Sequence, residues 1–116
     1  MIEQRDLLLV PFPFSDQSGK KVRPVVVISN KEFNAHSEDL VVVGITTNTS
    51  KGKYTLGLAT SDLEEGKLYA KCAIKTENML KIDRQLFIVK KIGKISKAKH
   101  ESIIAMINKI ISKNNN

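Results

Sequence analysis

Arg23 combines a reactive side chain with a fixed place on the backbone. It stands directly before Pro24, and a residue before proline is restricted to extended conformations, so we expect Arg23 to be held at the entrance of a strand. Its guanidinium is permanently charged and presents a planar fork of donors that matches a phosphate group. The structural alternative is an ion pair with a carboxylate at the edge of a sheet.

Thr46 is a second candidate, at the end of an aliphatic run. It follows Val41-Val42-Val43-Gly44-Ile45 and precedes the polar residues 47–50. A hydroxyl at the end of a strand is able to donate a hydrogen bond to a phosphoryl oxygen. The alternative is that Thr46 reflects only the high strand propensity of β-branched residues.

The elements that must position these side chains are mainly short, β-branched runs. Runs at residues 6–10, 24–28, 40–46, near 54–58, near 70–76 and at 85–92 predict about six strands. The second and third runs are apolar throughout, which is typical of strands buried on both faces. Polar loops at 15–21 and 48–53, a connection at 30–39 with at most a helical turn, and a turn at 62–66 separate the runs.

The C-terminal part of the chain has a helical pattern. Apolar residues recur at helical spacing from Ile103 to Ile111, and Ser96 is a suitable N-cap. Strands followed by one amphipathic helix argue against alternating βαβ units. We therefore expect a β-rich α+β fold, mostly antiparallel, which curls into a small, partly open barrel in one domain spanning residues 1–116.

Composition narrows the classes of function. The chain has 116 residues and a formal net charge of +7, which attracts polyanions such as nucleic acids. It contains no apolar run long enough for a bilayer and no secretory signal pattern, so we expect a cytoplasmic protein without membrane contact. The single Cys72 fits a reducing compartment.

Metal-dependent and generic acid–base chemistry find little support in the residue types. His36 and His100 are the only histidines and no cysteine pair has ligand spacing, so we expect no zinc or iron site and no cofactor. We interpret His100 as an exposed residue of the C-terminal helix and Cys72 as a buried strand thiol.

Three segments in one order resemble the PemK/MazF toxins of bacterial toxin–antitoxin systems. These are residues 5–14 (RDLLLVPFPF), residues 23–30 (RPVVVISN) and residues 42–46 (VVGIT). Residues 75–83 (KTENMLKID) are similar to a later motif of the family. The resemblance implies an SH3-like barrel, a homodimer, metal-independent cleavage of single-stranded RNA at short sequences, and an inhibitory antitoxin protein as partner.

The resemblance also assigns roles to residues. Arg23 falls on the family's catalytic arginine and Thr46 on its catalytic Ser/Thr. Lys75 and Glu77 fall where some members place a basic residue and a carboxylate near the scissile phosphate, which makes Glu77 a candidate general base. Asp16, in the first polar loop, is a weaker candidate that the resemblance does not supply. Residues expected to line the path of the RNA are Ser18, Lys20, Lys21, Lys51, Lys53 and Lys75.

Cleaving RNA without metal uses the 2′-hydroxyl of the substrate as nucleophile, so the protein must stabilise charge on the phosphorane. Arg23 suits that role better than proton donation, because a guanidinium holds its proton too tightly to give it up readily. Two other functions remain open at this point. One is a protein-binding toxin resembling the CcdB-like gyrase poisons, and the other is a non-catalytic RNA-binding barrel, although the low aromatic content argues against a base-stacking platform.

Overall fold

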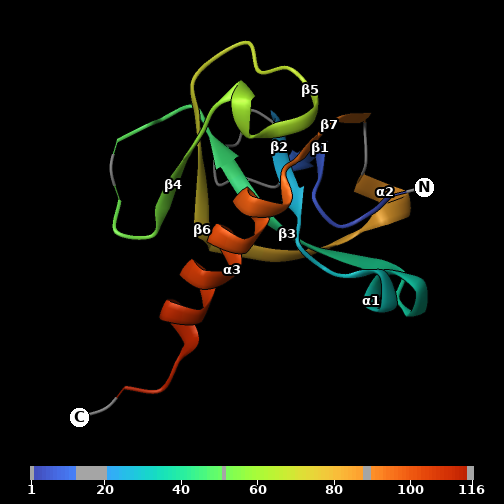
Figure 1. Ribbon diagram of the computed structural model, residues 1–116. Helices are drawn as coiled ribbons and strands as arrows, with labels where there is room; N and C mark the ends of the chain where they lie inside the picture. The colour runs from blue at the N-terminus through green and yellow to red at the C-terminus, as the bar shows by residue number, and fades with distance from the viewer. Residues whose placement is uncertain (1, 13–20, 51, 88–89, 115–116) are drawn as a thin grey trace.

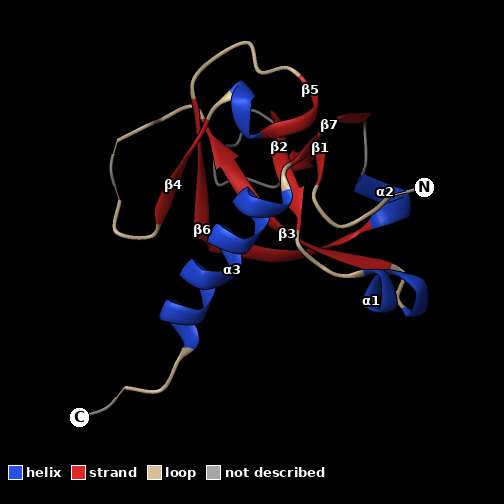
Figure 2. Ribbon diagram, viewed as in Figure 1, coloured by secondary structure: helices blue, strands red, loops and turns tan. Residues whose placement is uncertain are grey.

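The computed structural model describes residues 2–12, 21–50, 52–87 and 90–114. The described residues form one antiparallel sheet of seven strands that curls around an apolar core, with a C-terminal helix across its open side (Figures 1 and 2). The strands are β1 Asp6–Phe12, β2 Lys21–Val27, β3 Asp39–Thr46, β4 Thr55–Leu58, β5 Leu63–Gly66, β6 Cys72–Asp83 and β7 Lys90–Ile95. The helices are α1 Lys31–His36, the 3₁₀ turn η1 Thr60–Asp62, α2 Arg84–Phe87 and α3 Lys97–Ile111.

The strand order is β4-β6-β3-β2-β1-β7-β5, so β2 and β3 lie at the centre of the sheet. Every strand pair is antiparallel. The prediction of a β-rich, mostly antiparallel and partly open barrel with a C-terminal helix is confirmed. The sheet has one strand more than the six expected.

Apolar side chains fill both faces of the central strands. Val26 and Val43 belong to one buried cluster, whereas Val25 and Val42 belong to another, because successive residues of a strand point to opposite faces. All four are inaccessible to solvent, as the uninterrupted apolar runs predict.

Helix α3 closes the first of these clusters. The Ser96 side chain accepts a hydrogen bond from the backbone N–H of Lys99, so the predicted N-cap is confirmed. Ile103 and Ile107 are the buried residues of the helix and pack against the core from β1, β2, β3, β4, β6 and β7. The C-terminal turns of α3 extend beyond the sheet (Figure 1).

Three segments differ from the sequence prediction. Residues 85–92 are not one strand: the Asp83 carboxylate accepts from the backbone N–H of Gln85 at 2.9 Å, which favours the short α2 before β7 begins at Lys90. Residues 62–66 are not only a turn, because 63–66 pair with β7 as strand β5. Strand β6 also runs past the predicted end at 76, to Asp83.

Helix α1 is longer than the single turn expected between β2 and β3. Asn30 caps it by accepting from the backbone N–H of Phe33 at 2.9 Å. None of the described helices has the length and apolar character of a membrane span.

Candidate functional site

Arg23 lies inside β2, paired with Val10 of β1. The strand begins at Lys21, which pairs with Phe12, so Arg23 is its third residue and the prediction of a place at the strand entrance is wrong by two residues. Pairing with β1 adds residues 21 and 22 to the beginning of the strand, which the position of Pro24 alone does not indicate. The side chain is half-buried and its Nε is inaccessible to solvent.

Thr46 is the last residue of β3 and is half-buried. Its Oγ1 accepts a hydrogen bond from the backbone N–H of Asn48 at 3.0 Å, and the Asn48 side chain in turn accepts from the N–H of Ser50. A hydroxyl has one O–H donor and two acceptor lone pairs. This turn therefore holds Thr46 by an acceptor lone pair and leaves its O–H available to donate.

The register of β2 and β3 relates these two residues. Val25 is paired with Gly44 in an antiparallel ladder, and Arg23 and Thr46 each lie two residues further along toward the same end. Because side chains alternate between faces, both point to the face that carries Val25. The register thus brings a guanidinium and a hydroxyl, both hydrogen-bond donors, to one end and one face of a central strand pair.

Lys75 lies on the same face, one strand further across the sheet. It pairs with Gly44 of β3 on one side and with Thr55 of β4 on the other. In the next row, Ala73 pairs with Thr46 and with Gly57, and a Cβ added at Gly57 would have no other atom within 4 Å. The positions of β3 between Arg23 and Lys75 on this face are Gly44 and Thr46, which both have small side chains.

Sequence reasoning did not identify Gly44 and Gly57 as part of this surface. A glycine inside a strand pattern marks a place where another backbone or a ligand approaches closely, and this signal was available in the runs 41–46 and 54–58. At Gly44 the approaching group is Asn78, whose Cβ lies 3.5 Å from where a glycine Cβ would be.

Glu77 lies on an irregularity of β6, because the register moves from Val43–Met79 to Gly44–Lys75. The neighbouring Thr76 anchors this bulge by donating its hydroxyl to the carbonyl of Tyr54 at 2.7 Å. Glu77 itself is exposed and two residues from Lys75. The bulge therefore leaves a carboxylate accessible to solvent two residues along the chain from the basic Lys75.

The remaining predicted RNA contacts are only partly described. Lys53 is exposed, with its Nζ 5.5 Å from the centroid of the Tyr54 ring. Ser18, Lys20, Lys51 and Asp16 lie outside the described residues, as does the side chain of Lys21.

The two histidines and Cys72 do not belong to the group formed by Arg23, Thr46 and Lys75. His36 is exposed on α1. His100 is half-buried, which corrects the expectation of an exposed helix residue, and burial together with the charge of Arg5 lowers its pKa. Cys72 is half-buried at the start of β6 rather than fully buried, because only its successors enter the core, and partial burial raises its pKa. Among the described residues no group of His, Cys, Asp and Glu has the geometry to hold a metal ion.

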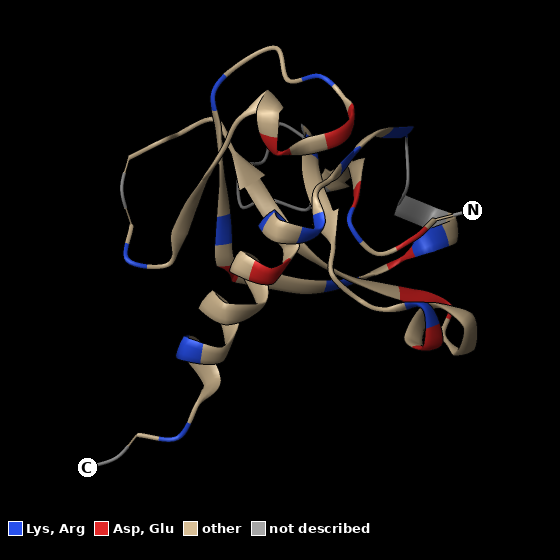
Figure 3. Cartoon of the chain, in the orientation of Figure 1, with Lys and Arg blue, Asp and Glu red and all other residues tan. Residues whose placement is uncertain are grey.

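The formal charges are unevenly distributed over the described residues (Figure 3). Acidic residues gather along η1 and β5 and around α1 with the start of β3, whereas basic residues are spread along the chain.

Comparisons with known proteins identify the family of this chain. Residues 3–111 match the family model of the PemK-like, MazF-like toxin of type II toxin–antitoxin systems. No match to a curated protein was found at the level of sequence.

Solved structures share the fold at low sequence identity. An endoribonuclease solved with its cognate antitoxin, from Mycobacterial species, has a TM-score of 0.79 at 14% identity and covers 98% of both chains. The MazE–MazF complex of Deinococcus radiodurans has a TM-score of 0.77 at 12% identity, covering 97% of this chain and 98% of that chain. The toxin MazF-mt6 of Mycobacterium tuberculosis has a TM-score of 0.74 at 15% identity, covering 95% of this chain and 99% of that chain. With a family model that spans nearly the whole chain and a fold that matches throughout, the protein belongs to the PemK-like, MazF-like toxins of type II toxin–antitoxin systems.

Proposed function

We propose that this toxin is an endoribonuclease that cleaves single-stranded RNA at short sequences without a metal ion, through attack of the substrate's 2′-hydroxyl on the adjacent phosphorus. The observation that carries the proposal is the register of β2 and β3, which puts Arg23 and Thr46 at the same end and on the same face of the sheet. The family membership and the description of related structures as endoribonucleases support it.

In the proposed reaction the 2′-oxygen forms a bond to phosphorus, its proton passes to a base, and the bond from phosphorus to the 5′-oxygen breaks. The 5′-oxygen takes up a proton from water and leaves as a hydroxyl. Arg23 stabilises the negative charge that develops on the non-bridging oxygens. The free O–H of Thr46 donates to one of them, and its bond from Asn48 keeps the hydroxyl oriented. Glu77 is the proposed proton acceptor, because it is an exposed carboxylate two residues along the chain from Lys75.

The RNA is proposed to lie across the small side chains between these groups. Gly57 leaves open space on the same face, and Lys75 and Lys53 attract the phosphates that flank the scissile bond. Ser18, Lys20, Lys21 and Lys51 are proposed further contacts. The loops are proposed to recognise the base sequence of the RNA.

The proposed protein partners follow from the membership of the toxin family. An antitoxin protein inhibits the enzyme in the cytoplasm, since related toxins have been solved in complex with antitoxins. The active form is proposed to be a homodimer of single-domain chains. Large apolar side chains remain exposed in the single chain, among them Ile104, Ile111 and Tyr69, and burial in a dimer would remove them from water.

The experiment that tests the proposal incubates the purified protein in EDTA with a mixed-sequence RNA and with an all-deoxy oligonucleotide of the same sequence. We expect cut RNA carrying 2′,3′-cyclic phosphate ends and intact DNA. An Arg23→Ala variant that keeps the wild-type circular dichroism spectrum should be slower by about 10²–10³-fold. Cleavage of the DNA would exclude 2′-hydroxyl attack, and full activity of the variant would remove Arg23 from the mechanism.

A further inference from the structure

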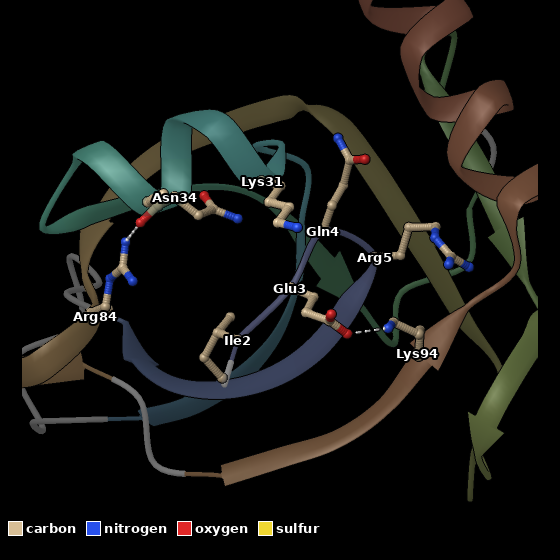
Figure 4. A pocket seen from close by; sticks show the side chains of 9 residues that line it. Ile2, Glu3, Gln4, Arg5, Lys31, Asn34, Arg84 and Lys94 are labelled. Atoms are coloured by element: carbon tan, nitrogen blue, oxygen red, sulfur yellow. Dashed lines mark hydrogen bonds and ion pairs between the residues drawn. The ribbon is translucent and has the colours of Figure 1, made fainter.

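A pocket of about 510 Å³ opens at the end of the sheet opposite to Arg23 and Thr46. It is bounded by the N-terminal segment before β1, by α1, which follows the far end of β2, by Arg84 and by Lys94 of β7 (Figure 4). Its volume lies within the range of about 300–1,000 Å³ that small-molecule sites occupy. The toxin mechanism uses none of its residues.

The lining is strongly basic. Four basic side chains and one carboxylate face the pocket, a net charge of +3. Arg5 is neutralised outside it by Glu64 at 2.8 Å, and Lys94 is neutralised by Glu3 at 2.7 Å. The Glu3–Lys94 pair lies on one side of the opening in Figure 4.

Lys31 and Arg84 account for the remaining charge. Within the part of the chain that the structure describes, neither has a carboxylate at ion-pair distance. The Nη2 of Arg84 donates to the backbone carbonyls of Asn34 and Ser37, which fixes the guanidinium in the wall. Figure 4 shows the Lys31 side chain reaching into the opening from α1. Lys31 and Arg84 therefore add two positive charges to the wall that no carboxylate among the described residues neutralises.

The floor of the pocket is apolar. Ile2 points into it and packs against the second core cluster, and Ala35 adds a small apolar surface from α1. A ligand that pairs an anionic group with a short hydrocarbon body would contact both kinds of surface.

Glu3 is the one carboxylate among the residues that line the pocket, and it is paired with Lys94. Glu32 of α1 belongs to a separate hollow, together with Phe33 and His36. The combination of unneutralised basic side chains and apolar surface therefore favours a small organic acid.

We propose that this pocket binds an organic acid with one carboxylate on a short aliphatic body, supplied either as a free small molecule or as an acidic side chain of a peptide. The proposal does not depend on RNA cleavage. It assigns to the toxin a ligand site distant from Arg23 and Thr46.

The test titrates the ¹⁵N-labelled full-length protein with sodium butanoate, and separately with butanamide, at constant ionic strength, while amide chemical shifts are recorded. An acetylated, amidated Gly-Leu-Glu-Gly peptide forms the third arm and a single-stranded RNA hexamer the fourth. Lys31→Gln removes one cation and Ala35→Leu fills the floor. Lys97→Gln, at an exposed position on α3, is the control for general charge loss.

We expect saturable shifts at residues 2–5 and 31–35 with butanoate or the peptide, at least fivefold weaker binding for both pocket variants, and unchanged binding for the control. Saturation by the peptide alone assigns the acid to a peptide, and saturation by butanoate assigns it to a small molecule. Absence of saturable shifts with either acid overturns the proposal. Equal shifts with butanamide, equal binding by Lys31→Gln, or stronger binding of RNA at these residues would also overturn it. Both pocket variants should cleave RNA at the wild-type rate, which separates this result from the proposed function.

Discussion

Adjacent isoleucines of α3 provide a controlled test of how the helix is held on the sheet. Ile103 is fully buried in the core, whereas Ile104 is 37% exposed. The two side chains are identical and have the same helical backbone, so alanine at either site changes helix propensity equally. The difference between Ile103→Ala and Ile104→Ala therefore reports burial alone.

The magnitude follows from the buried carbons. Ile103→Ala removes three carbon atoms from the core, about 2.4 kcal/mol at ~0.8 kcal/mol each. Incomplete collapse of the cavity adds to this, and such substitutions cost about 2–5 kcal/mol. We expect a loss of about 3 kcal/mol for Ile103→Ala and less than about 1 kcal/mol for Ile104→Ala.

Urea denaturation followed by circular dichroism measures both losses. With an m value of about 1.5 kcal/mol/M, Ile103→Ala lowers the midpoint by about 2 M. Each variant should be measured at two protein concentrations, because a dimer interface over Ile104 would make its loss depend on concentration. Equal, concentration-independent losses for the two variants would refute the placement of α3.

Three further predictions concern the site and its surroundings. Thr46→Val should lower kcat by about 10²-fold with little change in KM, while Thr46→Ser keeps activity; steady-state cleavage rates decide, and equal loss in both variants would indicate a steric role instead. Lys75→Gln should reduce the slope of log affinity against log salt by about 0.7 for single-stranded RNA, measured with non-cleavable RNA, and an unchanged slope would place Lys75 off the RNA path. Because burial lowers the pKa of His100, the unfolded chain binds its proton more readily, so stability should fall as the pH drops from about 6.5 through the folded pKa. Urea midpoints across this range should be less pH-dependent for His100→Gln, and an identical profile would contradict the assignment.

The central elements were predictable because their signals are local and repeated. The β-branched runs around Val25 and Val42 and the helical spacing of Ile103 and Ile107 are each sufficient to define an element. Strand β5 was not predictable, because residues 63–66 become a strand only by pairing with β7. Helix α2 arises from a side-chain cap at Asp83 that competes with the strand pattern of the residues after it.

The candidate site also has features that the sequence predicts and features that it does not. Arg23 and Thr46 stand at recognisable strand positions, so their candidacy follows from the sequence. Their common face requires the register of two strands, which no single segment encodes. The pocket beside α1 was missed entirely, because Ile2, Lys31 and Arg84 are brought together from distant parts of the chain.

The most direct measurement of the proposed mechanism is a double-mutant cycle of Arg23→Gln and Thr46→Val on kcat/KM for single-stranded RNA in EDTA. If both side chains hold one phosphate, the second substitution should cost much less once the first side chain has been removed, with a coupling of about 1 kcal/mol or more. Multiplicative losses in folded variants, with no coupling, would contradict the claim that Arg23 and Thr46 act on the same group.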